Sequence, residues 1–507
     1  MPIVKKPSSG PFTRTERIII TIPVLLASLL HAVNMSTAYV ALPNIQGNLS
    51  ATPDQVGWVI TAFVVASAIG TVITGWLANR LGRRRVFLGS IAGFTVTGAL
   101  CASATGLEDL VVYRILQGAV SAPLLPISQA IMLDTYPRER HGFAMSIWSM
   151  GMIMGPVLGP TIGAIVTEAY NWRWVFSINI PLGLLAFGAI FFTLPEADKR
   201  QDRLDWIGVS SLVIAVSALQ LMLDRGQRLD WFESPEIVIE AWLAVLGFYI
   251  FVVHCATARN PYLNLSIFRD RNFVVGLSLI FVFGVTVFST MFILPVFLQT
   301  VQGYPVITAG WVLSARGLGT AIAMLSGGIL ADRFSPKNLI LIGVLCCGIS
   351  SWLMTEWSTE VSMDEVIYLT VISGFGMGMM WVTLTTVTFS TLSPTLRTEG
   401  AALFALIRAI GASIGTSVVV AILVRSSQVS YIELRRHINP YHELLPPEGT
   451  VGAWDLESTS GLMSLYHLVA EQAQMIGFLN SFVFSAAVVF MAIPLVLLLK
   501  TPPRTKP

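Results

Sequence analysis

The chain has 507 residues, of which 54% are hydrophobic and only 12% charged. This balance excludes a water-soluble globular protein of this size and predicts a polytopic helical membrane protein. The formal net charge of +2 gives no overall electrostatic reason to bind nucleic acid. The four cysteines all fall in apolar segments, where they pack as small apolar side chains and do not indicate a disulfide framework.

The first apolar run follows a polar stretch, residues 1–17, and extends from Ile18 to Pro43. At about 1.5 Å per residue it is long enough to cross a bilayer core as a helix. It is longer than the apolar region of a signal peptide, no small-residue cleavage site ends it, and a second run follows directly. We therefore expect it to be the first transmembrane helix, preceded by a cytoplasmic tail.

Comparable runs continue along the chain, and together they predict fourteen transmembrane helices. After 18–43, the expected spans are 55–78, 86–104, 109–133, 142–167, 174–194, 206–223, 236–257, 274–298, 306–331, 338–357, 366–391, 400–424 and 475–499. An even number places both termini on one side of the membrane. Most of the 31 Lys and Arg residues lie in tails and loops that are cytoplasmic if the N-terminus is inside, so we expect both termini in the cytoplasm. The outer loops then hold only Arg173, Arg225, Arg228, Arg425, Arg435 and Arg436.

A short motif occurs twice. The stretch Gly75–Arg85 closes one apolar run with the letters GWLANRLGRRR, and Gly328–Arg333 closes another with GILADR. Internal repeats are typical of transporters. Six helices per repeat would place the two copies about two helices closer together than they are, so we expect the spans 206–223 and 236–257 to be an inserted pair. The expected organisation is a cytoplasmic tail (1–17), an N-terminal six-helix half (18–195), the inserted pair (196–257), five helices of a C-terminal half (258–424), a large outer loop (425–474), the last helix (475–499) and a cytoplasmic tail (500–507).

Seven motifs follow one another along nearly the whole chain. They are Ala41-Leu42-Pro43, the Gly75–Arg85 stretch, Arg114-x-x-Gln117-Gly118, Gly155-Pro156-x-x-Gly159-Pro160, Asn171–Trp174, Leu223–Gly226 with Asp230-Trp231-Phe232, and Leu265–Phe273. In this order they resemble the fourteen-helix drug:proton antiporter family, the EmrB/QacA group of the major facilitator superfamily, and its EmrB branch above all. The resemblance implies an all-α major facilitator fold and a multidrug efflux transporter of the inner (plasma) membrane that exports lipophilic compounds in exchange for protons by alternating access.

The resemblance assigns a gating motif to Gly75, Asn79, Arg80, Gly82, Arg83 and Asp134. It implies that Arg83 pairs with Asp134 and holds the outward-facing state, since alternating access needs contacts that form in one state only. Asn79 stands where the family usually has Asp, so it contributes no charge to a nearby helix end. The alternative is that these arginines only fix the orientation of the chain in the membrane.

Glycines recur every four residues along the span 142–167, with prolines between them. Glycines at that spacing let two helices touch closely, and prolines remove backbone donors and bend the segment. The resemblance assigns an antiporter motif to Gly151, Gly155, Pro156, Gly159 and Pro160. It implies a tight seal that makes exchange obligatory, whereas the alternative is ordinary packing of small residues.

Proton coupling needs a titratable group within the membrane, where ionisable side chains are costly and usually functional. His31 and Asn34 lie on one face of the span 18–43, and Arg114 lies in 109–133. The family commonly has Asp at the position of Asn34, and an amide carries no proton. We therefore hypothesise that His31 takes this role, with Arg114 modulating its charge. The alternative is that His31 stays neutral and bonds a backbone carbonyl.

Aromatic, Met and amide side chains in the middle of the spans suit bulky lipophilic substrates, because they adapt to varied shapes. From them we select Tyr39, Gln129, Trp148 and Trp381 as candidate substrate contacts. The alternative is that they pack the helices or face lipid. With few buried acids, we expect neutral, weakly acidic or monocationic substrates in preference to dications.

The expected partners are protons, lipophilic small molecules, membrane lipid and, by the resemblance, a periplasmic adaptor protein that leads to an outer-membrane channel. The loop 425–474 is the expected docking surface, unless it is a tolerated insertion. We expect no cofactor, no metal and no enzymatic activity, because the Gly-x-Ser-x-Gly pattern around Ser413 lies in an apolar helix and lacks the strand that a nucleophile elbow requires. Two other functions remain open: an exporter of one metabolite such as a fatty acid or siderophore, and a facilitator uncoupled from protons, which Asn34 and Asn79 would explain.

Overall fold

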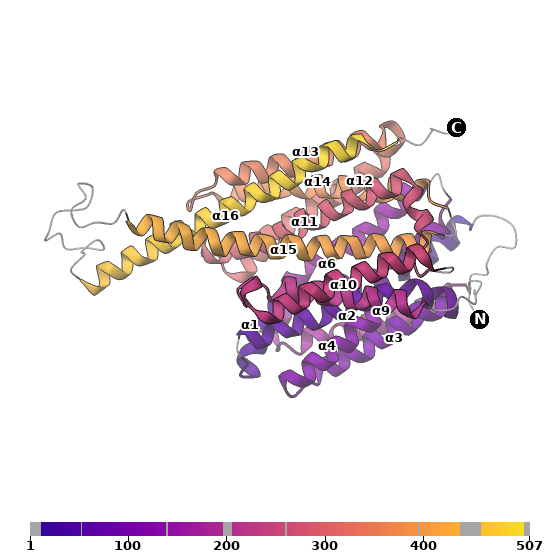
Figure 1. Cartoon of the computed structure of the whole chain (residues 1–507), viewed down its shortest axis with the longest axis horizontal. Helices are drawn as coiled ribbons and strands as arrows, with labels where there is room; N and C mark the ends of the chain where they lie inside the picture. The colour runs from indigo at the N-terminus through magenta and orange to yellow at the C-terminus, as the bar shows by residue number, and fades with distance from the viewer. Residues whose placement is uncertain are drawn as a thin grey trace.

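The computed structural model describes residues 12–51, 53–137, 140–195, 205–258, 261–393, 396–436 and 458–500. Throughout these residues the regular structure is helical, and the helices form one elongated bundle (Figure 1). Their bounds are α1 (Arg14–Asn48), α2 (Pro53–Leu81), α3 (Arg83–Ala102), α4 (Leu107–Ser121), α5 (Leu124–Thr135), α6 (His141–Ala169), α7 (Trp174–Ser177), α8 (Asn179–Thr193), α9 (Trp206–Arg225), η2 (Trp231–Glu233), α10 (Pro235–Thr257), η3 (Leu265–Arg269), α11 (Arg271–Thr300), α12 (Val306–Arg333), α13 (Pro336–Leu353), η4 (Met354–Glu356), α14 (Met363–Ser390), α15 (Arg397–Arg436) and α16 (Thr459–Leu497).

Each predicted span coincides with helix. Three spans are broken: 109–133 contains α4 and α5, 174–194 contains α7 and α8, and 338–357 contains α13 and η4. The break before α5 falls at Pro123, which cannot donate a backbone hydrogen bond. Twelve helical stretches of the described chain are long and apolar enough to cross a membrane by length and composition. The helices α6 and α12, with 29 and 28 residues, fill two further predicted spans, and the total of fourteen stays a prediction.

The helices pack as two groups that meet along the middle of the bundle. In the first group α1 packs on α6, α2 on α4, and α3 on α4 and α8. In the second, α11 packs on α15, while α14 packs on α12 and α13. Between the groups, α6 contacts α12 and α14, and α15 contacts α2 and α5. Buried apolar side chains from both groups belong to one continuous core.

The helices α9 and α10, which the sequence predicts to be an inserted pair, lie along the side of the bundle where α2 and α15 meet (Figure 1). Asp205 caps the beginning of α9. The Asp205 carboxylate accepts hydrogen bonds from the backbone N–H groups of Gly208 and Tyr262 and lies 2.8 Å from Nε2 of His254. The Tyr262 hydroxyl in turn donates to the backbone carbonyl of Val72 in α2. Burial acts to raise the pKa of Asp205, but these hydrogen bonds and the nearby imidazole outweigh it and lower that pKa.

The expectation of a loop over 425–474 was wrong at both of its ends. Helix α15 continues to Arg436 and α16 already begins at Thr459, so both project beyond the rest of the bundle (Figure 1). Polar side chains end the apolar pattern near Arg425 but do not break a helix, and the two projecting segments support each other through the rings of Tyr431 and Tyr466, whose centroids are 5.9 Å apart. We call residues 425–436 and 459–474 the helical extension; residues 437–457 between them lie outside the described residues.

Candidate functional site

The structure forms an ion pair at the gating motif. Nη1 of Arg83, at the start of α3, donates to Oδ2 of Asp134 in the last turn of α5. Gly82 precedes Arg83 with φ of 91°, a left-handed conformation that a glycine adopts without strain. Arg84 donates to the backbone carbonyl of Phe191 in α8 at 2.7 Å. The turn between α2 and α3 is therefore tied to two other helices of its half.

The other members of this motif make fewer contacts. The guanidinium of Arg80 lies 5.0 Å from the ring centroid of Trp76, on the same helix. Asn79 is half-buried near the end of α2. A methyl group added at Gly75 would meet no atom within 4 Å. The pair between Arg83 and Asp134 is thus the contact through which the motif joins separate helices.

Arg114 lies at the centre of the N-terminal half and is fully buried. Its Nε donates to the backbone carbonyl of Val59 at 2.9 Å, and its Nη1 donates to Oδ1 of Asn34 at 2.8 Å and Oε1 of Gln117 at 2.7 Å. Its guanidinium also lies 4.1 Å from the ring centroid of Phe63. Hydrogen bonds to charged groups are stronger than neutral ones, so Arg114 locks α1, α2 and α4 together.

His31 lies beside Arg114, next to the same Phe63 ring. Its ring centroid is 5.8 Å from that of Phe63, and the side chain is only 7% exposed. Its Nδ1 is buried and has no hydrogen-bond partner within the described residues. The two charged groups that act on the imidazole are Arg114 and Arg408 of α15. We call His31, Asn34 and Arg114 the α1–α4 cluster; its members bring together a cation, an amide and an imidazole without a carboxylate.

Three of the four candidate substrate contacts are buried. The indoles of Trp148 in α6 and Trp381 in α14 stack with centroids 6.3 Å apart and planes 19° apart. Trp148 donates to Ser128 at 2.8 Å, and Trp381 donates to Ser149. Because α6 and α14 belong to opposite halves, the stacked indoles hold the two halves together at this point of the bundle. Gln129 is 3% exposed, and its Nε2 has no partner within the described chain.

Tyr39 differs from these three, since 48% of its side chain is exposed. Its hydroxyl interacts electrostatically with Asp224, in the last turn of α9, and with Arg114. Asp224 accepts a hydrogen bond from the hydroxyl of Thr61 in α2. From the sequence, Asp224 falls in a motif after an apolar run and near the outer interface, which made it a marginal candidate for proton coupling. The packing of α9 against α2 was not visible in the sequence.

The glycines of α6 pack against α1. A Cβ at Gly155 would overlap Ala32 and lie 2.8 Å from the backbone nitrogen of Val33, and one at Gly163 would lie 3.1 Å from Cα of Thr37. The two backbones therefore touch over about two turns. The side chains of Pro156 and Pro160 lie outside the described residues.

Two more arginines inside the bundle come from the C-terminal half: Arg316, which is buried, and Arg408, which is half-buried. Arg316 in α12 donates from Nη2 to Thr290 at 2.8 Å and Ser373 at 3.1 Å, while its Nε and Nη1 find no partner in the described chain. The guanidinium of Arg408 lies between two rings, 5.8 Å from the centroid of Phe288 and 5.9 Å from that of Trp381. Neither arginine faces a carboxylate within the described residues.

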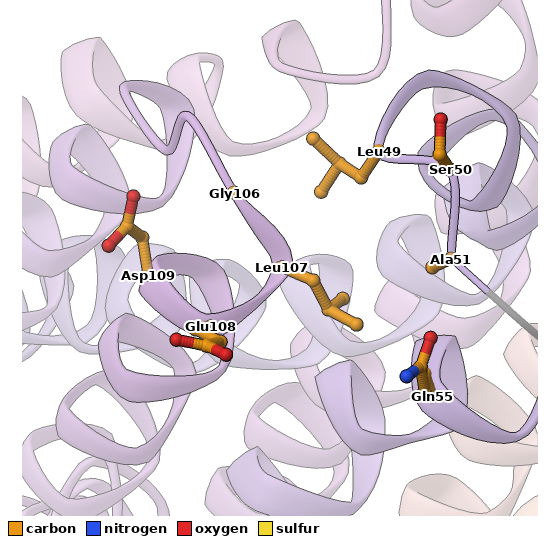
Figure 2. Close-up of a pocket in the computed structure, with 8 residues that line it drawn as sticks. All are labelled: Leu49, Ser50, Ala51, Gln55, Gly106, Leu107, Glu108 and Asp109. Carbon is orange, nitrogen blue, oxygen red and sulfur yellow. The ribbon is translucent and has the colours of Figure 1, made fainter.

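A hollow of about 420 Å³ opens where the end of α1, the start of α2 and the start of α4 meet (Figure 2). It is lined by Leu49, Ser50, Ala51, Gln55, Gly106, Leu107, Glu108 and Asp109. None of the predicted substrate contacts lines it, so it is a surface feature of the mouth of the bundle. Among the described residues, no group of His, Cys, Asp and Glu side chains is arranged to hold a metal ion.

Comparison with known proteins gives the arrangement a context. The family profile of the Major Facilitator Superfamily matches residues 24–416. The multidrug export protein EmrB of Escherichia coli K12 is 32% identical over 435 residues, which is 85% of each chain. The fatty acid resistance protein FarB of Neisseria gonorrhoeae is 32% identical over 492 residues, 95% of this chain and 96% of that protein. The crystal structure of the human organic anion transporter MFSD10 is similar in fold, with a TM-score of 0.59 at 15% identity over 93% of this chain and 99% of that chain.

Proposed function

The chain belongs to the Major Facilitator Superfamily, in its EmrB branch, and from this premise we propose that it exports lipophilic small molecules across the inner membrane in exchange for protons. The observation that carries the proposal is the 32% identity with a multidrug export protein over 85% of both chains. The two packed halves, each with a buried arginine in its core, fit a transporter that works by rocking one half against the other. The proton gradient would drive the cycle, with no cofactor and no enzymatic step.

Alternating access then requires the contacts that close one end of the bundle to break. The stacked pair of Trp148 and Trp381 joins the two halves, and the pair of Arg83 and Asp134 holds α3 to α5. Both residues of the ion pair are partly exposed, with side-chain exposures of 22% and 52%, so the pair is cheap to break. A contact of about 1 kcal/mol or less suits a gate, since the two states must differ by only a few kcal/mol.

The packing of α6 on α1 would keep the exchange free of leaks. Backbones in direct contact at Gly155 and Gly163 leave no space for water between the two helices. The α1–α4 cluster lies beside this seam, so movement of α1 and the charge state of the cluster are mechanically linked. We propose that His31, Asn34 and Arg114 take part in proton coupling through this link.

The helical extension is the proposed docking surface for a periplasmic adaptor protein, through which substrates would pass to an outer-membrane channel. This places the extension outside and both termini in the cytoplasm, as the Lys and Arg distribution favours. The extension carries exposed apolar side chains, among them Ile432, Leu462 and Tyr466. A photocrosslinking residue at Ile432 should capture the adaptor in cells, whereas the same residue at Trp242, exposed on α10, should capture lipid; equal capture at both would contradict the proposal.

An exporter of one acidic lipophile is the second candidate. Arg316 is buried and Arg408 half-buried, neither faces a carboxylate in the described chain, and cations in such surroundings favour an anionic ligand. The relative FarB, named for fatty acid resistance, is also 32% identical. A proton-uncoupled facilitator is the third reading, because Asn34 occupies the position of the family's acid.

One experiment separates these functions. The purified chain is placed in proteoliposomes with an imposed pH gradient, and proton flux is recorded together with the flux of a lipophilic fluorescent cation or of a fluorescent fatty acid. Opposite, coupled fluxes with several substrates support multidrug antiport. Coupled flux of the fatty acid alone supports the narrow exporter, and substrate flux that ignores the gradient would overturn the exchange mechanism.

A further inference from the structure

The carboxylate of Asp224 occupies an unusual place for an acidic residue of this chain. It accepts a hydrogen bond from Thr61, which lies more than two turns into α2, and it acts electrostatically on Tyr39, which lies more than two turns from the nearer end of α1. At about 5.4 Å per turn, both partners are more than about 11 Å from the ends of their helices. Asp224 and Tyr39 are both exposed.

The charged neighbours leave this carboxylate without an ion pair in the described chain. The adjacent Arg225 is engaged elsewhere, at 2.5 Å from Glu236 and 3.5 Å from Glu240. Arg228 lies against the backbone of α2, with Nη2 2.9 Å from the position of a Cβ at Gly57. Arg114 of α4 is fully buried and acts electrostatically on Tyr39, and from α15 the neighbouring groups are the neutral hydroxyls of Ser413 and Ser417.

The same turn of α9 joins the two halves. Ser417 of α15 donates to the backbone carbonyl of Leu223 at 2.5 Å, and Ser413 donates to Gln220 at 2.7 Å. On the other side, Thr61 of α2 donates to Asp224. The contact from α15 uses neutral groups and does not depend on pH. The contact from α2 depends on the protonation state, because only the ionised carboxylate is purely an acceptor.

We propose that Asp224 is the proton-carrying carboxylate of the exchange, so that the inserted helix α9 supplies the acid that α1 lacks at Asn34. A proton that binds this carboxylate makes it a weaker acceptor, so the hydrogen bond from Thr61 weakens. Weakening of this bond loosens the contact between α2 and α9, while the two hydrogen bonds from α15 to α9 remain. Release of the proton restores the carboxylate and the bond. This inference rests on the proposed exchange with protons.

The test compares Asp224→Asn with Asp230→Asn in the full chain in proteoliposomes. Asp230 is an exposed carboxylate in the same connection, outside the network, and its left-handed backbone conformation (φ 53°) suits Asn. Two readouts are recorded: accumulation driven by a pH gradient, and exchange of labelled for unlabelled substrate without a gradient. We expect Asp224→Asn to lose at least tenfold in driven accumulation and to keep the exchange, and Asp230→Asn to match the wild type.

The outcomes separate this inference from the proposed function. If the wild type couples the two fluxes and Asp224→Asn couples them equally well, Asp224 is not the proton carrier, although the exchange stands. If the wild type shows no coupling, the proposed exchange itself is wrong. Should Asp224→Asn also lose the gradient-free exchange, Asp224→Glu decides, because it keeps a titratable group: retained coupling supports the inference, and a loss equal to that of Asn overturns it.

Discussion

Adding one methyl group to the seam between α1 and α6 should destabilise the protein. In Gly155→Ala the new Cβ would overlap the Cβ of Ala32 and approach the backbone nitrogen of Val33 to 2.8 Å. Backbone atoms cannot turn away as a flexible side chain can, so the two helices must separate. Overpacking of this kind costs about 1–3 kcal/mol. The seam would also open, so leakage of protons should rise.

A matched control is Gly188→Ala in α8, where a Cβ meets no atom within 4 Å. There the methyl group only reduces the freedom of the unfolded chain, which stabilises by about 0.4–1 kcal/mol. Thermal unfolding of the purified protein in detergent should therefore move in opposite directions for the two variants. Proton leak is measured in proteoliposomes with a pH-sensitive dye. Equal unfolding temperatures and equal leaks for both would refute the reasoning that backbone contact at Gly155 forms the seal.

Three further predictions concern charged groups. Asp134→Asn removes the ion pair with Arg83 and should change the unfolding temperature little, because the pair is partly exposed. It should, however, raise the labelling of cysteines introduced next to this pair on the inner side of the bundle. Exchanging the two charged residues should return the labelling to the level of the wild type. Arg114→Lys should abolish transport, because a lysine cannot reproduce the hydrogen bonds to Asn34 and the two other acceptors. Each acceptor left unsatisfied costs about 1–3 kcal/mol. Normal transport by this variant would contradict the prediction. The pKa of Asp205 is lowered in the folded state, so its stabilising effect is present above the unfolded pKa of about 3.9 and is lost as the pH falls below that value. In Asp205→Asn the unfolding temperature should therefore depend less on pH between pH 6 and 3 than in the wild type.

The helical spans could be predicted from the sequence because each is a long apolar run, and length alone sets the minimum for crossing a bilayer. The pair of Arg83 and Asp134 was also predicted, although from the family resemblance and not from spacing. The helical extension was missed because its polar face ends the apolar signal while its helix continues. Its support comes from Tyr431 and Tyr466, and contacts between distant segments leave no local pattern.

The position of α9 could not be predicted either, for a related reason. An apolar run shows that a helix crosses the membrane but not which neighbours it has. The hydrogen bonds from Ser413 to Gln220 and from Thr61 to Asp224 join polar residues far apart in the chain, each of them unremarkable when read alone. Only their contact gives the last turn of α9 a role between the halves.

The distribution of charge within the bundle links these observations. Arg114, Arg316 and Arg408 are cations set among amides, hydroxyls and aromatic rings, and within the described chain no carboxylate faces any of them at hydrogen-bond distance. Cations in such surroundings are costly unless an anion or water joins them, so the core is better suited to acidic or neutral lipophiles than to dications. The carboxylate of Asp224 makes no ion pair with any of these arginines in the described chain and accepts a hydrogen bond from Thr61 of α2. Substrate and proton would then use separate groups, and coupling between them would pass through the movement of α2 against α9 instead of competition for one site.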